Sequence, residues 1–215
     1  MIHHMSELPG MAAVLVSELR DKEIQVDRMR FRHNLERLGE CIAWDLAKQL
    51  KFQSLPVETP LGMAEGKKLA RQPVLATILR AGLPMHHGFL RVFDQADCSY
   101  VSAYRKYHPG GDFEIAVEYV SSPDLTGRDL ILIDPMLATG ASIVQVYKAL
   151  IQRGKPEQVH VVCAIASQEG IQMVRKSLPA EVHIWAGAID EETTARGYIV
   201  PGLGDAGDLA FGEKL

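Results

Sequence analysis

The sequence predicts an α/β protein in which a mostly parallel sheet is flanked by helices on both faces. From Pro73 onward, short apolar runs alternate with stretches of helical periodicity, which is the pattern of repeated βα units. The apolar runs are nearly continuous, as expected of strands buried on both faces. The chain has 215 residues, of which 47% are hydrophobic, so one domain spanning residues 1–215 can bury a substantial core.

Residues 1–50 are predicted to form a helical N-terminal part of this domain. Leu35, Leu38, Ile42 and Leu46 recur every three or four residues and make one apolar stripe. Arginines are frequent here, but aspartates and glutamates stand between them, which favours a solvated or intersubunit face over a nucleic-acid-binding arm. Residues 57–66 are predicted to be turn and loop.

The remaining elements follow in order along the chain. Strands are predicted at 74–79, 99–104, 130–133, 159–166 and 182–186, and helices at 83–93, 143–153 and 169–176. Residues 105–122 predict a hairpin with a Pro-Gly-Gly turn. Ligands of such sheets bind beyond the C-terminal ends of the strands. The candidate loops are therefore 80–82, 105 onward, and 134–142.

Composition narrows the classes of protein to consider. The net charge of −4 predicts no general attraction to nucleic acid. The three cysteines are far apart and form no C-x-x-C pair, which is typical of a reduced cytoplasmic protein. No apolar run approaches the length of a membrane span, and no signal peptide is evident.

The loop at 134–142 carries the strongest chemical signal. It reads Asp134, Pro135, Met136, Leu137, Ala138, Thr139, Gly140, Ala141, Ser142. A loop between a strand and a helix N-terminus offers backbone N–H groups and a positive dipole end to a phosphate, and Thr139 and Ser142 add hydroxyls. Asp134 repels phosphate, so we expect it to face sugar hydroxyls or a metal. The alternative is a plain βα turn capped by Thr or Ser.

The glycine pattern of this loop matches neither the dinucleotide-binding nor the Walker motif. The whole string resembles the motif with which type I phosphoribosyltransferases bind 5-phosphoribosyl 1-diphosphate (PRPP), in the Asp-Pro form of the uracil phosphoribosyltransferase family. The run from Tyr198 to Asp208, followed by Phe211 and Gly212, resembles the base-site signature of that family. The alternative for this run is a glycine-rich tail with frequent turns.

The resemblance implies a type I phosphoribosyltransferase-like fold. Residues 105–122 would form a flexible β-hairpin flap, and residues 190–215 a C-terminal base-binding hood. It further implies transfer of a phosphoribosyl group from PRPP to uracil, giving UMP and diphosphate, with Mg²⁺ brought by PRPP rather than held by protein side chains. The implied partners are the two substrates, a second copy or more of the chain, and GTP as an effector. Neither nucleic acid nor a membrane is expected as a partner.

The same resemblance assigns roles to individual residues. Arg80, Arg105 and Asp205 form the catalytic set, with the two arginines on the diphosphate. The PRPP-binding residues are these three and the entire loop from Asp134 to Ser142. Uracil is expected to be bound by backbone groups near Ile199, Gly204, Asp205 and Ala206. Which group removes the N1 proton of uracil is left open.

Three features qualify the resemblance. Relatives can hold a cis non-proline peptide at the turn after strand 74–79, which we expect at Arg80–Ala81. Ala141 stands where a second glycine is common, and we expect it to be tolerated because φ is ordinarily negative at a helix N-terminus. Leu209 stands where a basic residue is common.

Two alternative functions are kept. One is transfer to another base, which the Asp134-Pro135 pair disfavours. The other is an RNA-binding regulator on the same fold with weak or no transferase activity. The acidic net charge disfavours the regulator, whereas the basic N-terminal third favours it.

Overall fold

The computed structural model describes residues 1–107 and 113–213, with side chains given for all of these except 105–107, 113 and 114. Its main sheet has the strand order β1 (Ile2–His4), β10 (His183–Asp190), β9 (Gln158–Ser167), β7 (Asp129–Ile133), β4 (Val74–Leu79), β5 (Asp97–Tyr107), β6 (Phe113–Ser121). A short strand, β8 (Met136–Leu137), also pairs with β9. Every pairing is parallel except that of β5 with β6. The predicted parallel sheet is confirmed.

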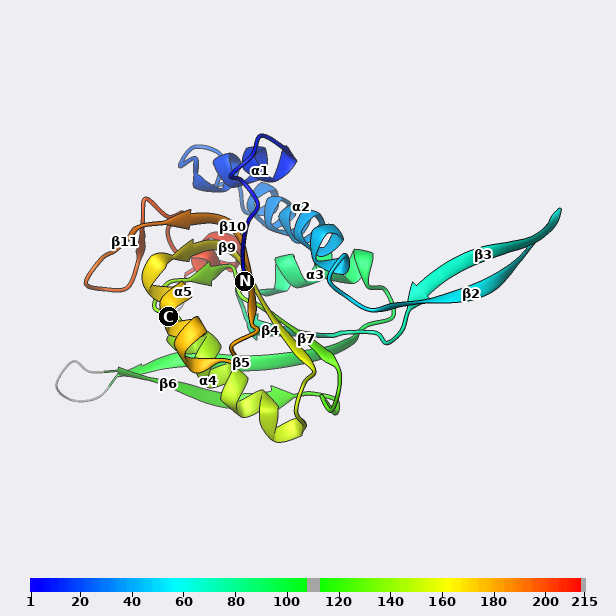
Figure 1. Ribbon diagram of the computed structural model, residues 1–215. Coiled ribbons are helices and arrows are strands. Elements are labelled where there is room, and N and C mark those ends of the chain that lie inside the picture. The colour runs from blue at the N-terminus through cyan, green and yellow to red at the C-terminus, as the bar shows by residue number, and fades with distance from the viewer. Residues whose placement is uncertain (108–112, 214–215) are drawn as a thin grey trace.

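Helices cover both faces of this sheet (Figure 1). On one face lie α1 (Met11–Arg20), α2 (Arg28–Ala47) and α3 (Leu83–Val92), and on the other α4 (Ala141–Leu150) and α5 (Gln168–Ser177). Within β4, Leu75 packs in the core on the α1–α3 side, whereas Val74 and Ala76 pack in the core on the α4–α5 side. Successive strand residues point to opposite faces, so an unbroken apolar run supplies both cores.

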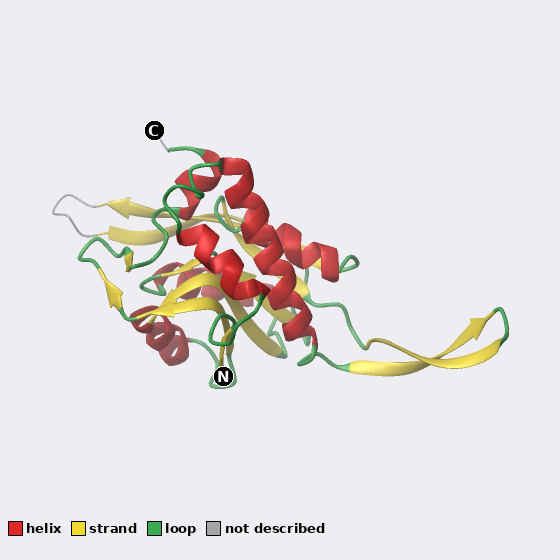
Figure 2. Cartoon of the chain, turned by 90° about the horizontal axis from the view of Figure 1, so that it is seen from above, coloured by secondary structure: helices red, strands yellow, loops and turns green. Residues whose placement is uncertain are grey.

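Two predictions for the first 66 residues are corrected. Ile2–His4 is not helical but forms the edge strand β1, with Ile2 opposite Ile184 of β10. Residues 57–66 are not a loop: β2 (Phe52–Thr59) and β3 (Gly62–Leu69) form an antiparallel hairpin that projects from the rest of the chain (Figure 2). Both faces of this hairpin are largely exposed. Its sequence therefore lacks the alternation of apolar and polar residues by which a half-buried strand is predicted.

The other predicted elements are found near their predicted bounds. The helix predicted at 143–153 ends at Leu150 and continues as a single 3₁₀ turn, η1 (Ile151–Arg153). The predicted hairpin pairs Arg105 of β5 with Ile115 of β6, and its tip, 108–112, lies outside the described residues. The C-terminal segment contains β11 (Glu192–Thr193), β12 (Ile199–Val200) and α6 (Ala206–Phe211). In the part of the chain described, no helix is long and apolar enough to span a bilayer.

Candidate active site

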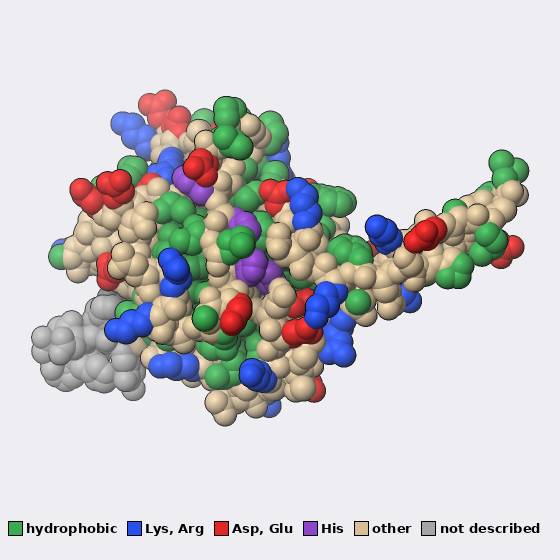
Figure 3. Space-filling view, viewed as in Figure 1, with side chains coloured by type: hydrophobic (Ala, Val, Ile, Leu, Met, Phe, Trp, Pro, Cys, Tyr) green, Lys and Arg blue, Asp and Glu red, His purple; other side chains and the backbone are tan. Residues whose placement is uncertain are grey.

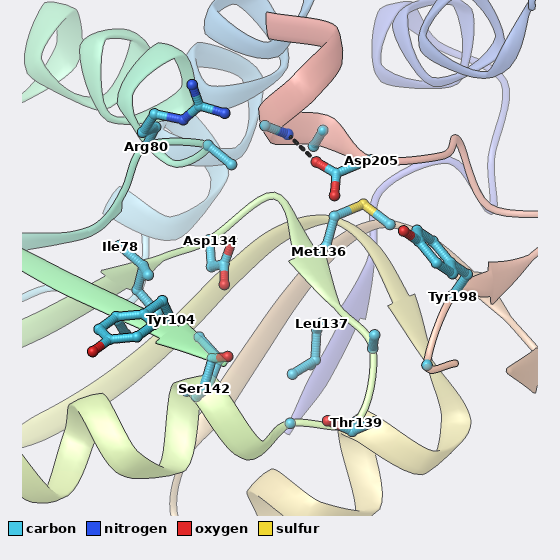
Figure 4. Close-up of a pocket in the computed structure, with 18 of the residues that line it drawn as sticks. Ile78, Arg80, Tyr104, Asp134, Met136, Leu137, Thr139, Ser142, Tyr198 and Asp205 are labelled. Carbon is cyan, nitrogen blue, oxygen red and sulfur yellow. Dashed lines mark hydrogen bonds between the residues drawn. The ribbon is translucent and has the colours of Figure 1, made fainter. Parts of the chain in front are cut away.

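A cavity of about 590 Å³ opens where β4 and β7 end, beside Ala103 and Tyr104 of β5 and between the start of α4 and the C-terminal segment (Figure 4). This is the edge of the sheet at which ligands were expected. Most of the predicted site residues lie on its wall: Arg80, Asp134, Met136, Leu137, Ala138, Thr139, Gly140, Ser142, Gly204, Asp205 and Ala206. The fold thus brings the 134–142 loop and the 198–208 run, which are far apart in the sequence, to one cavity.

Three predicted residues are not on the wall of this cavity, and the side chain of a fourth, Arg105, lies outside the described residues. Pro135 is buried, and its carbonyl accepts hydrogen bonds from the N–H groups of Ala164 and Ile165 in β9. Ile199 is buried in the core on the α1–α3 side of the sheet. Ala141 is the first residue of α4, and its N–H donates to Thr139 Oγ1 at 3.4 Å.

The cavity also contains residues to which no role was assigned. Tyr104 of β5 and Tyr198 of the C-terminal segment lie on opposite sides of it (Figure 4). The sequence did contain a signal for Tyr198. Neighbouring side chains in an extended segment point to opposite sides, so if the apolar Ile199 points into the core, Tyr198 points away from it. The remaining unassigned wall residues are Ile78, Leu79, Ala81, Ala103, Ile143, Gly197 and Gly207.

Gly140 shapes the loop that precedes α4. Its φ of +77° is in the left-handed region, which favours glycine. A Cβ atom here would lie 2.9 Å from Met173 Cβ and 3.0 Å from the Gly170 carbonyl oxygen of α5. No described residue other than glycine has a positive φ, so the expected tolerance of Ala141 is confirmed for the backbone. Helix α4 begins at the cavity, and Ser142 and Ile143 of its first turn lie on the wall, so the positive end of the helix dipole is close to the cavity.

Ser167 fixes this loop from the side away from the cavity. It is fully buried at the N-cap of α5, and its Oγ donates to the Ala138 carbonyl at 2.5 Å and accepts from the Gly170 N–H at 2.9 Å. A Cβ on Gly170 would lie 2.4 Å from the same Ala138 oxygen. The start of α5 is therefore in close contact with the carbonyl groups of the loop. Sequence reasoning missed Ser167, although a serine before a helical stretch is an N-cap signal.

The two acidic residues of the cavity have different surroundings. Burial raises the pKa of Asp134 to about 7, the negative charge of Asp205 adds to the rise, and the N–H of Met136 opposes it. Asp205 is the N-cap of α6, and its Oδ1 accepts from the N–H groups of Gly207 at 2.9 Å and Asp208 at 3.0 Å (Figure 4). The capping bonds use Oδ1 and fix the orientation of the carboxylate at the cavity wall.

Arg80 reaches from the end of β4 to α6. Its Nη2 donates to the Gly212 carbonyl at 3.0 Å and lies 3.3 Å from Asp208 Oδ1. The cis non-proline peptide bond in the described residues is Leu79–Arg80, one bond earlier than expected. The C-terminal segment is also fastened at its other end, where Asp190 binds Arg20 through both carboxylate oxygens and accepts from the Gly202 N–H.

Comparisons with known proteins agree with this geometry. A family model described as uracil phosphoribosyltransferase matches residues 9–213. A uracil phosphoribosyltransferase of Porphyromonas gingivalis (strain ATCC BAA-308 / W83) is 52% identical over 200 residues, which cover 93% of each chain. One from Pyrococcus furiosus is 40% identical over 204 residues, which cover 94% of this chain and 86% of the relative.

Solved structures give the same fold. The AQ2163 protein from Aquifex aeolicus superposes with a TM-score of 0.87 at 29% identity, covering 99% of this chain and 98% of that one. A hypoxanthine phosphoribosyltransferase from Staphylococcus aureus has a TM-score of 0.51 at 14% identity, covering 75% of this chain and 76% of that one. At that identity the second likeness concerns the fold alone.

Proposed function

This chain belongs to the uracil phosphoribosyltransferase family, and from that membership we propose how its cavity performs the reaction. The enzyme transfers the phosphoribosyl group of PRPP to uracil and gives UMP and diphosphate. The observation that carries the proposal is that one cavity joins the 134–142 loop to the 198–208 run. The RNA-binding alternative has no support in the relatives found.

The 5-phosphate end of PRPP is assigned to the loop before α4. Ala138, Thr139, Gly140 and Ser142 are on this part of the wall, and their N–H groups and the hydroxyls of Thr139 and Ser142 are the donors proposed for the phosphate. Unsatisfied N–H groups at a helix N-terminus favour a phosphate dianion. Ser167 supports the loop from behind without touching the substrate, and the left-handed backbone of Gly140 gives the loop its turn.

The ribose is assigned to the two carboxyl groups. Asp134 is placed to accept hydrogen bonds from ribose hydroxyls, as its position at the end of β7 supports. In the transition state the sugar gains positive charge while the bond from C1′ to diphosphate breaks and the bond from C1′ to uracil N1 forms. Fixed negative groups near a developing cation lower the barrier, and Asp205 is held for this by its capping bonds.

The departing diphosphate is assigned to Arg80, with Arg105 kept as a prediction from the sequence. A guanidinium matches two phosphate oxygens at once. The proton that leaves uracil N1 balances the reaction, and its acceptor is left open.

Mg²⁺ fits the donors available here. Asp134 and Asp205 place carboxylate oxygens on the wall of the cavity, and oxygen is the ligand that Mg²⁺ prefers. Among the described residues no group of three or more His, Cys, Asp or Glu side chains is placed to hold a metal, so the remaining ligands would come from PRPP. When bound, the ion offsets part of the charge of the diphosphate.

Uracil is assigned to the backbone of the segment around Gly204 and Ala206, beside the ring of Tyr198. Uracil presents an acceptor, a donor and an acceptor along one edge, whereas cytosine reverses the pattern at its 4-position. A site whose groups pair with the edge of uracil would have buried groups left unpaired if cytosine were bound. Such a site discriminates strongly between the two bases.

A homo-oligomer is proposed from the hairpin β2–β3, which we call the arm. A lone two-stranded hairpin is only marginally stable in water. The arm exposes Leu61 completely, Met63 at 69% and Phe52 at 50%, and hydrophobic side chains gather at its tip (Figure 3). A second copy of the chain covering the arm would remove this surface from water. The cytoplasmic location and GTP activation stay predictions from cysteine usage and from the family resemblance.

The proposal is tested by measuring diphosphate release from PRPP and Mg²⁺ with uracil, cytosine, orotate, hypoxanthine and guanine in parallel, with the nucleotide product identified. We expect turnover with uracil alone. The variant Arg80→Ala should lower that turnover by about 100-fold or more, because it removes a fixed charge at the leaving group. Folded protein that releases diphosphate with none of the bases would contradict the proposal.

A further inference from the structure

The side chain of Asp208 ties the arginine at the diphosphate end of the cavity to helix α6. Arg80 Nη2 lies 3.3 Å from Asp208 Oδ1 and donates to the Gly212 carbonyl at 3.0 Å. Both side chains of the ion pair are 36% exposed. Arg80 is on the wall of the cavity and Asp208 is not, and the contact between them was given no part in the reaction above.

The contact restrains a side chain that is otherwise mobile. A free arginine samples many rotamers, and ordering it for a ligand costs side-chain entropy. Because the guanidinium is planar, holding Nη2 at Asp208 and Gly212 restricts the directions of its other N–H groups. Nε of Arg80 is buried and has no hydrogen-bond partner among the described residues. The two contacts made by Nη2 also leave the N–H groups of Nη1 as donors for a further acceptor.

Helix α6 does not depend on the Asp208 carboxylate for its own position. Asp205 caps its first turn, and Arg32 Nη1 donates to the Ala210 carbonyl at 2.7 Å in its last turn. Leu203, Ala206 and Ala210 bury this region in the core on the α1–α3 side. Removing the carboxylate of Asp208 should therefore loosen Arg80 more than it disturbs the helix.

We propose that Asp208 is a positioning residue that orients Arg80 for the diphosphate group of PRPP. Its carboxylate acts through the arginine and does not touch the substrate. The inference rests on the role of Arg80 in the proposed function. It also links the two ends of the cavity, because the helix that anchors Arg80 is the one that Asp205 caps.

The test is a double-mutant cycle with Asp208→Ala, Arg80→Ala and the combined variant, read by kcat/KM for PRPP and by calorimetric binding of inorganic diphosphate. We expect Asp208→Ala to weaken both by about 10-fold, as for coupled side chains in contact. The KM for uracil should change less than about twofold, because the base end keeps its contacts. Asp208→Asn should recover part of the loss, since its amide oxygen still accepts from Nη2. In the Arg80→Ala background, Asp208→Ala should cost nothing further.

The exposed Glu213→Ala is the matched control for losing a carboxylate near the end of the same segment. Equal losses from Asp208→Ala in both backgrounds, or an unchanged diphosphate affinity in Asp208→Ala and Asp208→Asn, would overturn the inference and leave the proposed function intact. A wild-type diphosphate affinity in Arg80→Ala itself would instead remove the assigned role of Arg80, and the inference with it. Circular dichroism of each variant separates these outcomes from loss of folding.

Discussion

The pKa of Asp134, raised to about 7 from an ordinary 3.8, makes stability depend on pH at the scale of one residue. At a pH between these two pKa values, the folded chain holds the proton of the Asp134 carboxyl more tightly than the unfolded chain does. The contribution of Asp134 to the free energy of unfolding is therefore highest at low pH, and it is lost as the pH rises from about 4 to 7.

The variant Asp134→Asn removes this titration while keeping the shape of the side chain. We expect it to match the wild type near pH 4 and to become the more stable protein by pH 8, by about 1.4 kcal/mol for each unit of the pKa shift. Urea unfolding at several pH values without ligands measures the difference. Parallel stability curves for the two proteins would contradict the raised pKa.

Ser167 offers a second prediction at this scale, because it supports the phosphate loop from a buried position. We expect Ser167→Ala to raise the KM for PRPP several-fold with little change in kcat, and to lower the free energy of unfolding by about 1 kcal/mol as an N-cap is lost. Steady-state kinetics and urea unfolding check both.

Ser177→Ala is its matched control, because Ser177 is exposed at the far end of the same helix, α5. A KM for PRPP in Ser167→Ala that equals that of the control would contradict the supporting role.

At the scale of an element, we expect the arm to contact a second copy of the chain. Among the described residues its strands pair only with each other, from Phe52 opposite Leu69 to Thr59 opposite Gly62, and its apolar tip is exposed. If a second copy covers it, Leu61→Asp with Met63→Asp places charges in an apolar contact, where an unpaired charge is costly.

We expect this double variant to sediment as a smaller species than the wild type while keeping a cooperative unfolding transition. Analytical ultracentrifugation makes the measurement, and the exposed arm substitution Lys67→Ser serves as control. An unchanged sedimentation coefficient in the double variant would exclude the arm tip from the interface.

The whole molecule is stabilised by any ligand that binds only its folded form. The cavity is bounded on one side by the ends of β4 and β7 and on the other by the C-terminal segment, so PRPP would hold these parts together. We expect PRPP with Mg²⁺ at 100 times its dissociation constant to add about 2.7 kcal/mol to the free energy of unfolding. A thermal shift assay detects this, with inorganic phosphate and Mg²⁺ as the control. A melting temperature no higher with PRPP than with inorganic phosphate would contradict PRPP binding.

The sequence by itself determined the central sheet and the chemistry of the two motifs. Strands such as 74–79 and 130–133 are buried on both faces. A strand of this kind is an unbroken apolar run in the sequence, so it can be predicted without knowing its neighbours. The phosphate loop and the base-site run are likewise contiguous segments, and their order of residues was enough to indicate the family.

Only the tertiary structure decided the features that join distant segments. Arg80 meets Asp208 across 128 positions, and Ser167 meets Ala138 across 29. The arm and strand β1 escaped prediction because one has no buried face and the other is too short to show a period. The burial of Ile199, and with it the outward direction of Tyr198, depends on what packs behind the segment. So does the pKa of Asp134, because burial and the nearby Asp205 exist only once the chain has folded.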